Sequence, residues 1–366
     1  MSFLREERAP LTRKQAVEQG GLGSVSQNAS QNQAYTGLFK KNTRCPPKEM
    51  SVLSLSLLQP GGLLLVWEER DTRQDLALVF DVVLTGLTVR YVQMGSGWLR
   101  DQCILGPRQG GGWYLLLPPP STRRGAPETY DTPYPGGSSY TWMTPTRQAT
   151  FLRLAGQIPL ACSIVPDAYV EGGNMIVTRR HVFLGEAAGI LFRGMSNTEE
   201  SLLEFMTRTF HRPIADYILL PQAMYHIDLY LLYVGHQTFF LPHPDTLVAD
   251  SLLARRIAQT RDILRMLSYT VCEMRHGFVA SGRVGCLDEL DGSFFNSLAG
   301  MLADGVQYLL CPSYGTTADS RFIGEVRTHV HNAIVLCVGD SRENIAEFRT
   351  DGGGLRCQTA YSQGTT

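Results

Sequence analysis

One cysteine, one histidine and three carboxylates lie beside glycine runs or at the ends of apolar segments of this sequence, and together they could catalyse a reaction. A cysteine thiolate is a nucleophile, a histidine transfers protons, and a carboxylate can orient that histidine or bind a cation. The four motifs that contain them are Trp98-Leu99-Arg100-Asp101, Glu171-Gly172-Gly173-Asn174, His226-Ile227-Asp228 and Gly352-Gly353-Gly354-Leu355-Arg356-Cys357.

The surroundings of these residues indicate which substrate the chemistry would suit. Three consecutive glycines before Cys357 permit a tight turn and a close approach of the backbone, which would present the thiol at a rim. Residues two apart on a strand point to the same face, so a strand would project His226 and Asp228 side by side. Asp101 and Asp228 would form an anionic cradle, and a guanidinium suits it because carboxylates accept its N–H groups in pairs.

Each of these residues also has a purely structural explanation, which the sequence leaves open. Asp101 beside Arg100 is compatible with a surface ion pair, and Glu171 with a solvated side chain in a tight turn. His226 and Cys357 are compatible with ordinary core packing, because an isolated cysteine most often behaves as a small buried hydrophobe. The case for catalysis therefore depends on finding all of the required groups in one chain.

The segments between the motifs alternate between short apolar runs and helical patterns, which predicts an α/β fold with mixed sheets. We expect strands at 63–67, 88–94 and 228–234, and helices at 197–209 and 246–269. The sequence has neither a Gly-x-Gly-x-x-Gly motif after a strand nor a P-loop. It therefore lacks the signatures of the common nucleotide-binding folds.

Composition along the chain predicts two regions. Residues 1–48 are polar and lack an apolar period, so we predict a flexible leader, followed by a single catalytic domain at 49–366. Residues 106–146 contain runs of glycine and proline, interrupted by a short apolar run at 113–117. We predict an irregular loop there, which is either a lid over the site or a surface excursion.

Charge and composition restrict the partners and the compartment. With 33 basic and 34 acidic residues, the chain has no electrostatic reason to bind nucleic acid or a membrane surface. No apolar stretch approaches the roughly 18 residues of a membrane span. The first residues carry charges where a secretory signal needs an apolar core, and the eight cysteines are scattered. We therefore predict reduced thiols and a cytoplasmic location, with export independent of a signal peptide left open.

The order of the four motifs resembles the guanidino-group-modifying superfamily with the pentein fold. This superfamily includes agmatine deiminase, arginine deiminase, dimethylarginine hydrolase and the amidinotransferases. The resemblance extends over residues 50–360 in motif order. It implies an α/β propeller of five ββαβ-like units around a central channel, with the site at the channel mouth, and it implies no metal and no organic cofactor.

On this resemblance, each candidate residue takes a role in an attack on a guanidinium. Cys357 would attack the guanidinium carbon and form a covalent thiouronium. His226 would protonate the departing amine and then activate water. Glu171 would hold His226 in position, while Asp101 and Asp228 would bind the guanidinium nitrogens.

The substrate is less closely defined than the chemistry. The chain length and Trp98 before Arg100-Asp101 look most like agmatine deiminase, whereas the Gly-Gly-Gly-x-Arg-Cys ending is closer to arginine deiminase. We place Trp98 and Arg356 in the predicted substrate-binding set, and Arg356 would either bind a substrate carboxylate or cap the turn. Gln102-Cys103 and Leu229-Tyr230 depart from the common deiminase patterns.

The predicted function is a hydrolase that releases ammonia from agmatine, arginine or a protein-bound arginine. Two alternatives stay open: an amidinotransferase, in which an acceptor amine replaces water, and a pentein-fold binding or effector module without catalysis. The expected partner is a small guanidine or the arginine side chain of a protein, with no nucleic acid and no membrane. Assembly into a homo-oligomer is compatible with the sequence.

Overall fold

The structure is a computed structural model, and the chain divides into two compact units, of which Cys45–Thr366 contains every described residue. The predicted leader at 1–48 and most of the predicted loop at 106–146 lie outside the described part. The described residues are 53, 55–67, 86–92, 99–100, 103–108, 111–117, 150–151, 153–154, 157–158, 160–164, 171–195, 199–279, 283–285, 290–339 and 354–363.

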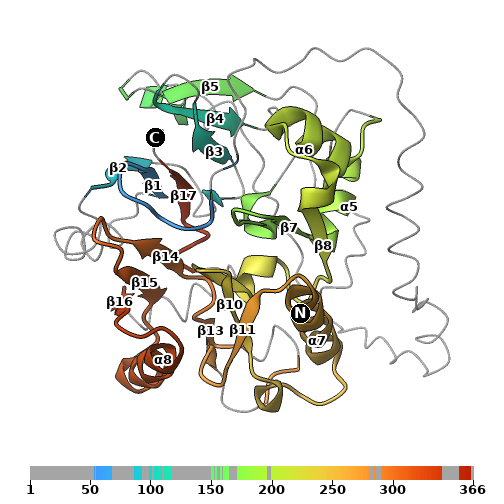
Figure 1. Cartoon of the computed structure of the whole chain (residues 1–366), viewed down its shortest axis with the longest axis vertical. Helices are drawn as coiled ribbons and strands as arrows, with labels where there is room; N and C mark the ends of the chain where they lie inside the picture. Colours follow the sequence, from blue (N-terminus) through green and yellow to red (C-terminus); the bar gives the residue numbers. More distant parts are fainter. Residues whose placement is uncertain are drawn as a thin grey trace, which may run out of the picture. The chain divides into compact units, whose positions relative to one another are not determined.

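Five three-stranded sheets with one internal pattern are the main elements of this unit (Figure 1). In each sheet the middle strand pairs antiparallel with one neighbour and parallel with the other, which confirms the prediction of mixed sheets. The sheets are β17 (Thr359–Ser362), β1 (Leu63–Trp67) and β2 (Thr88–Val92); β3 (Ile104–Pro107), β4 (Trp113–Leu117) and β5 (Leu160–Ile164); β6 (Met175–Val177), β7 (Val182–Gly185) and β8 (Tyr217–Leu220); β9 (Leu232–Gly235), β10 (Thr238–Pro242) and β11 (Thr270–Met274); and β14 (Leu298–Met301), β15 (Gln307–Pro312) and β16 (Ile334–Val338). Between β11 and β14 in the sequence, the short strands β12 (Phe278–Val279) and β13 (Gly292–Ser293) form an antiparallel pair of their own.

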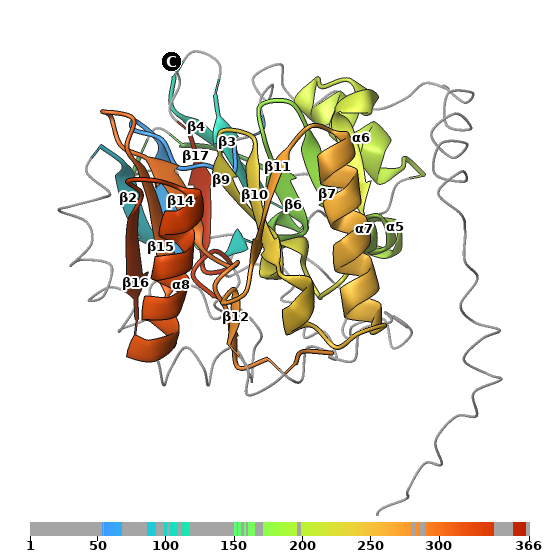
Figure 2. The ribbon, with the colours of Figure 1, turned by 60° about the horizontal axis from the view of Figure 1, so that its bottom comes forward.

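In the part of the chain that the structure describes, helices connect the parallel strands of three sheets, and residues 150–151 and 153–154 are helical between β4 and β5 of a fourth. A parallel pair needs such a crossover, because a tight hairpin can join only antiparallel strands. Helices α7 and α8 contact the sheets that they connect, as Figure 2 shows. The helices are α5 (Glu186–Met195) and α6 (Leu202–Phe210) between β7 and β8, α7 (Leu252–Met266) between β10 and β11, and α8 (Thr316–His329) between β15 and β16.

The first sheet joins the two ends of the described chain. Strand β17 pairs antiparallel with β1, with Leu63 opposite Ser362 and Val66 opposite Thr359. Strand β1 is apolar on both faces, β17 is buried throughout, and side chains of both strands contribute to two of the core clusters. The strand that follows the predicted nucleophile is therefore held in the core by residues about 300 positions earlier in the sequence. For example, the Gln59 N–H donates to the hydroxyl of Tyr361, 302 residues away, at 2.6 Å.

The predicted helix boundaries were wrong at the N-termini, and two helices were not predicted. Helix α6 begins at Leu202 and not at 197, because Ser201 forms a capping box with Glu204, whose Oε2 accepts from the Ser201 N–H at 2.8 Å. Helix α7 begins at Leu252, after the N-cap Ser251, and not at 246. The sequence prediction missed α5 and α8 entirely.

The described part of the predicted loop is regular. Residues 104–107 and 113–117 form a hairpin, with Gly106 opposite Tyr114. Gly111 and Gly112 have φ of 106° and 78°, so the glycine run makes the turn that joins the two strands. The apolar run at 113–117, which the sequence analysis set apart from the loop, is therefore strand β4, whereas the glycine run before it belongs to a hairpin turn and not to a long irregular loop.

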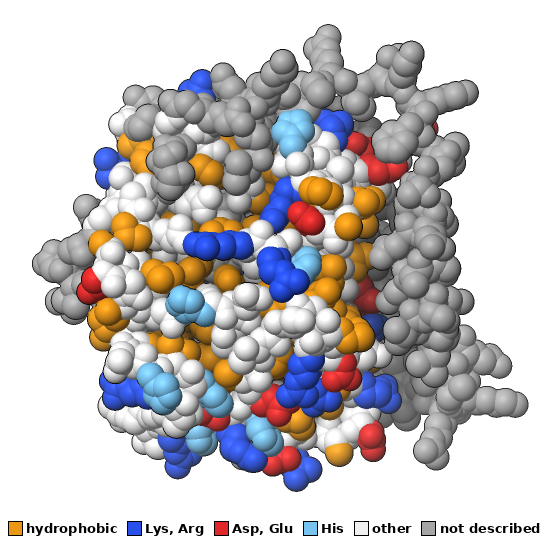
Figure 3. Space-filling view, in the orientation of Figure 1, with side chains coloured by type: hydrophobic (Ala, Val, Ile, Leu, Met, Phe, Trp, Pro, Cys, Tyr) orange, Lys and Arg blue, Asp and Glu red, His pale blue; other side chains and the backbone are white. Residues whose placement is uncertain are grey.

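Surface charge is mixed around α7. Side chains of both signs lie close together on this part of the molecule in Figure 3. Arg256 Nη1 lies 2.9 Å from Glu186 Oε2, and Arg261 and Arg265 both contact Glu273. Exposed pairs of this kind contribute little to stability. No helix among the described residues is long and apolar enough to cross a membrane.

Candidate functional site

Each of the five sheets has a residue of the candidate site within six positions before the outer strand that pairs antiparallel with the middle strand, and we call this outer strand the first strand of its sheet. Arg100 precedes β3, Glu171 precedes β6, His226 and Asp228 precede β9, and Cys357 precedes β17. The remaining sheet, which starts with β14, contributes Asn296. First strands of different sheets also contact one another: β17 contacts β3, and β14 contacts β9. The repeated topology therefore brings residues from distant parts of the sequence to one place.

Cys357 lies in a turn that Asn296 holds. The Cys357 N–H and the Gly354 N–H each donate to Asn296 Oδ1 at 3.1 Å, and the Arg356 N–H donates to the Asn296 carbonyl at 3.2 Å. The amide Nδ2 of Asn296 lies 3.1 Å from Cys357 Sγ. Both side chains are buried, with Cys357 1% and Asn296 0% exposed.

His226 and Glu171 are in direct contact. His226 Nε2 lies 3.2 Å from Glu171 Oε2, and both side chains are 3% exposed. Asn174 Nδ2 donates to the same carboxylate oxygen at 3.2 Å, and Gln222 Nε2 in turn donates to Asn174 Oδ1 at 2.8 Å. The carboxylate is therefore fixed by neighbours that are themselves fixed, which sets the orientation of the imidazole.

Asp228 is fully buried and lies near both the Cys357 thiol and the cation of Arg356. Its carboxylate lies within 4.8 Å of both a ring nitrogen of His226 and Cys357 Sγ. Arg356 Nε lies 3.3 Å from Asp228 Oδ2, although it is not aligned for a hydrogen bond. Neither carboxylate oxygen of Asp228 has a hydrogen-bond partner among the described residues. Buried polar atoms without partners are costly and often mark a place where a ligand supplies them.

Burial changes the titration of this charge pair. Burial raises the pKa of the Asp228 carboxyl, and the nearby positive groups, of which Arg356 has the largest effect, act in the opposite direction. Burial, followed by repulsion from Arg100, lowers the pKa of the Arg356 guanidinium to about 9. Both groups therefore resist carrying charge, and each depends on the other to do so.

Arg100 ties the start of the second sheet to the turn of Cys357. Its backbone N–H donates to the Cys357 carbonyl at 3.1 Å, and its Nε donates to the Arg356 carbonyl at 2.9 Å. A Cβ on Gly172 would lie 2.5 Å from the Arg100 carbonyl oxygen, so this glycine allows the two segments to approach.

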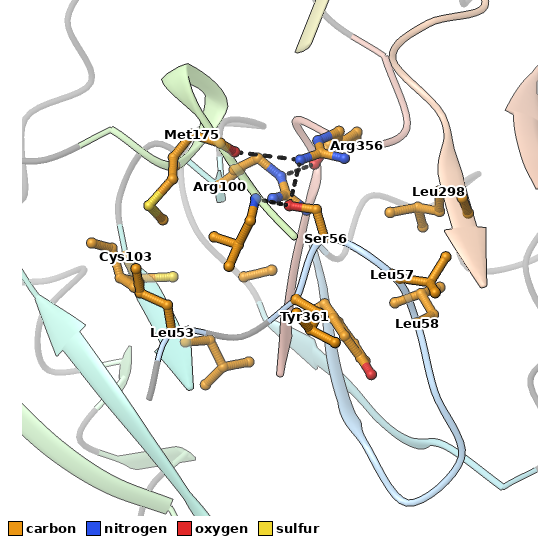
Figure 4. Close-up of a pocket in the computed structure, with 17 residues that line it drawn as sticks. Leu53, Ser56, Leu57, Leu58, Arg100, Cys103, Met175, Leu298, Arg356 and Tyr361 are labelled. Atoms are coloured by element: carbon orange, nitrogen blue, oxygen red, sulfur yellow. Dashed lines mark hydrogen bonds between the residues drawn. The ribbon is translucent and has the colours of Figure 1, made fainter. Parts of the chain in front are cut away.

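A pocket adjoins the site on the side of Arg356. In Figure 4, Arg356, Arg100 and Ser56 lie together, and labelled leucine side chains lie on both sides of them. Arg356 Nη2 donates to Ser56 Oγ at 3.1 Å and to the Met175 carbonyl at 3.4 Å. Cys357, His226 and Asp228 do not line this pocket, so we do not assign it to the reacting part of a substrate.

Three residues of the site carry atoms of the kinds that bind metal ions. Among the described residues, His226, Asp228 and Cys357 are the one group whose nitrogen, oxygen and sulfur atoms lie close enough to hold an ion. We assign no metal to this group, because the guanidinium of Arg356 lies 3.3 Å from Asp228 Oδ2 and disfavours a second positive charge there.

The structure brings together five of the seven residues that the sequence singled out, namely Cys357, His226, Glu171, Asp228 and Arg356. Trp98 and Asp101 lie outside the described residues. The predicted reason for the proximity of His226 and Asp228 was wrong, because they lie at a short 3₁₀ helix (Ile227–Leu229) and β9 starts only at Leu232.

Sequence reasoning missed Asn296 and Gln222. Asn296 follows Phe294 and Phe295 without a glycine run, so the feature that marked the other motifs is absent. The signal that could have found it is position, because it stands two residues before the first strand of its sheet. Cys357 stands two residues before its own strand in the same way.

Gly185 supplies the space for the residues that hold His226. A Cβ there would collide with Gln222 Oε1 and would lie 2.7 Å from Asn174 Oδ1. We expect Gly185→Ala to destabilise the fold by about 1–3 kcal/mol, as overpacking does, and to lower any activity that depends on His226. Chemical unfolding measures the first effect. Gly189→Ala is the matched control, because nothing lies within 4 Å of its Cβ on helix α5, and it should not destabilise the protein.

The fold is similar to that of solved deiminases. Agmatine deiminase of Enterococcus faecalis has a TM-score of 0.59 at 12% identity, over 90% of this chain and 100% of that chain. Agmatine deiminase of C. jejuni has a TM-score of 0.54 at 12% identity, over 86% of this chain and 97% of that chain. A Porphyromonas gingivalis protein to which arginine deiminase activity has been ascribed provisionally has a TM-score of 0.53 at 12% identity, over 86% of this chain and 96% of that chain.

The sequence comparisons find less than the structural ones. No family model matches the chain, and no curated protein matches it. The likeness to solved structures confirms that the chain shares the fold of agmatine and arginine deiminases, as the order of the motifs predicted.

Proposed function

We propose that this protein is a deiminase that hydrolyses a guanidino group through a covalent intermediate on Cys357. The observation that carries the proposal is the buried group of a thiol, an imidazole and a carboxylate within 4.8 Å of one another, at the starts of two sheets. The carboxylate of Asp228 lacks hydrogen-bond partners among the described residues, and a guanidinium supplies both charge and N–H donors.

The roles follow from these positions. The Cys357 thiolate attacks the guanidinium carbon, a C–N bond breaks, and ammonia departs with a proton from His226. Water then attacks the thiouronium carbon and gives its proton to His226, the C–S bond breaks, and a ureido product leaves. We assign proton transfer to Nδ1 of His226, because Nε2 is engaged with Glu171. Asp228 binds the guanidinium, and we keep Asp101 and Trp98 as proposed substrate contacts.

The substrates that we propose are agmatine, arginine and protein-bound arginine. The similar solved proteins include agmatine deiminases, which supports a guanidine substrate at the level of the fold. Arg356 is 2% exposed and contacts Asp228, so in this state it does not present its guanidinium to a substrate carboxylate.

The test is to incubate the protein with these guanidines and measure ammonia, the ureido product and the mass of the intact protein. The proposal predicts ammonia release with one of them and a transient adduct on Cys357. Adding an acceptor amine tests transfer, because an amidinotransferase would release no ammonia and would modify the amine. Folded protein that forms neither an adduct nor a product with any guanidine or acceptor would contradict the proposal.

One observation favours a second candidate, a binding module without catalysis. The guanidinium of Arg356 already lies against the carboxylate that a substrate would need. Such a protein would bind a guanidine or a partner without turnover. Calorimetric binding of agmatine or arginine that leaves both ammonia and protein mass unchanged would support this candidate.

We also propose that the five sheets are the five units of a closed propeller. The repeated strand pattern and the contacts between first strands of neighbouring sheets support this arrangement. The site would then lie where the five first strands begin, at one mouth of a central channel.

Loss of the Glu171 charge should impair proton transfer more than binding. In Glu171→Gln, the amide can still contact His226 but no longer stabilises its protonated form. We expect kcat to fall by about 10–100-fold with a smaller change in KM, because general acid–base catalysis contributes factors of this order. Steady-state kinetics on the guanidine with the highest turnover measure kcat and KM separately, and a change confined to KM would contradict the assigned role.

A further inference from the structure

The side-chain amide of Asn296 has one orientation that satisfies its neighbours. Oδ1 lies 3.1 Å from two backbone N–H groups, those of Gly354 and Cys357, and a backbone N–H can only donate. The oxygen must therefore face the backbone, and the NH₂ group must face the other way. There it meets two acceptors, Cys357 Sγ at 3.1 Å and the Asp228 carbonyl at 3.5 Å.

A donor in this position distinguishes the two forms of the sulfur. A neutral thiol is a weak acceptor, whereas a thiolate is a strong one. A hydrogen bond to the charged form of a group favours that form. The donor is also buried, with 0% of Asn296 exposed, so water does not compete with it. The amide thus fixes where the sulfur lies and supports its negative charge.

We propose that Asn296 is a positioning residue of this site, which holds the Cys357 sulfur in place and favours its thiolate form. The part of this inference that concerns catalysis rests on the proposed deiminase function. The contact with the sulfur does not. Asn296 is also the contribution of the β14 sheet, so every one of the five sheets supplies a residue around the nucleophile.

The substitutions of Asn296 leave the charged and titratable residues around the Cys357 sulfur unchanged. His226 and Asp228 lie within 4.8 Å of it, Arg356 is the adjacent residue and interacts electrostatically with it, and Arg100 bonds to the same turn. Glu171 acts through His226. A difference between wild type and an Asn296 variant therefore reports the amide and not these groups.

The experiment titrates the thiolate of Cys357 by its ultraviolet absorbance, with a Cys357→Ser version of each protein subtracted. Asn296→Ala removes the donor, and Asn296→Asp keeps the oxygen that accepts from the backbone while it replaces the donor with a negative charge. We expect the titration midpoint to move to higher pH by about 1 unit in the first and by more in the second.

Ser293→Ala is the control for loosening of this segment. Ser293 is buried and its Oγ donates to the Leu229 carbonyl at 2.7 Å, and no hydrogen bond is described between it and the sulfur. Its titration should match the wild type. Folded Asn296 variants that titrate as the wild type, or a Ser293→Ala midpoint that moves as far as theirs, would overturn the proposal.

Kinetics separate this inference from the proposed function. With an active wild type, the acid limb of the pH profile of kcat/KM should move with the thiolate midpoint in Asn296→Ala. If the wild type releases no ammonia from any guanidine but the midpoint still moves, the role of Asn296 at the sulfur stands and the deiminase proposal fails. If the wild type is active and the midpoint stays, only the role of Asn296 fails.

Discussion

Replacing Cys357 with alanine should lower ammonia release by on the order of 10⁴-fold or more, because no other group can form the covalent intermediate. The fold should remain intact. Cys357 is buried but small, and the backbone contacts of its turn, from Gly354 and Arg100, do not use the sulfur. Ammonia assays measure the activity, and chemical unfolding measures the stability.

Cys272→Ala is the matched control for loss of a thiol. Cys272 is a buried free cysteine on β11, and burial raises its pKa, so it has the properties of a packed and unreactive thiol. Its replacement should leave turnover close to that of the wild type. A Cys357→Ala variant that retains turnover would remove the covalent mechanism from consideration.

Replacing Arg356 with methionine should cost about 3 kcal/mol of unfolding free energy near neutral pH. The change leaves the carboxylate of Asp228 buried, 0% exposed, without its counter-charge. Because burial raises the folded-state pKa of this carboxyl, the folded state holds its proton more tightly than the unfolded state does. The deficit should therefore be small below the ordinary pKa of an aspartate and should grow as the pH rises through the raised value.

Urea unfolding at acidic and neutral pH measures this dependence. The double variant Arg356→Met with Asp228→Asn is the control, because it removes both charges together. A buried pair replaced on both sides is often neutral in stability, so the double variant should recover most of the loss at neutral pH. A single Arg356→Met variant as stable as the wild type at every pH would show that the two charges do not depend on each other.

The sequence predicted the members of the site better than their local structure. Cys357 and Glu171 were found because glycines mark a close approach of the backbone, and at Gly172 the structure shows what the glycine permits, a contact with Arg100. Asn296 carries no such mark. Its importance comes from contacts between the β14 and β17 sheets, which are set by tertiary structure and not by nearby residues.

Element boundaries were decided by single hydrogen bonds that periodicity does not contain. Helix α6 begins where Ser201 and Glu204 exchange bonds, although Asn197 and Thr198 are equally plausible caps in the sequence. His226 and Asp228 belong to a 3₁₀ turn, and their apolar neighbours led to the prediction of a strand. The class of mixed sheets was predictable because short apolar runs alternate with longer helical segments over the whole chain.

The pairing of β17 with β1 has a consequence for the order in which a cell makes the protein. Synthesis proceeds from the N-terminus, so Leu63 to Val66 emerge with one edge unpaired and wait for Thr359 to Ser362. Such long-range pairing forms slowly, because the entropy of closing a long loop is lost before the strand contacts stabilise the chain. Cys357 is made after the other candidate residues of the site, the latest of which is Asn296. A nascent chain thus carries the candidate residues of the other four sheets before Cys357 and its strand are present, and the proposed chemistry requires that Thr359 to Ser362 have been made and paired.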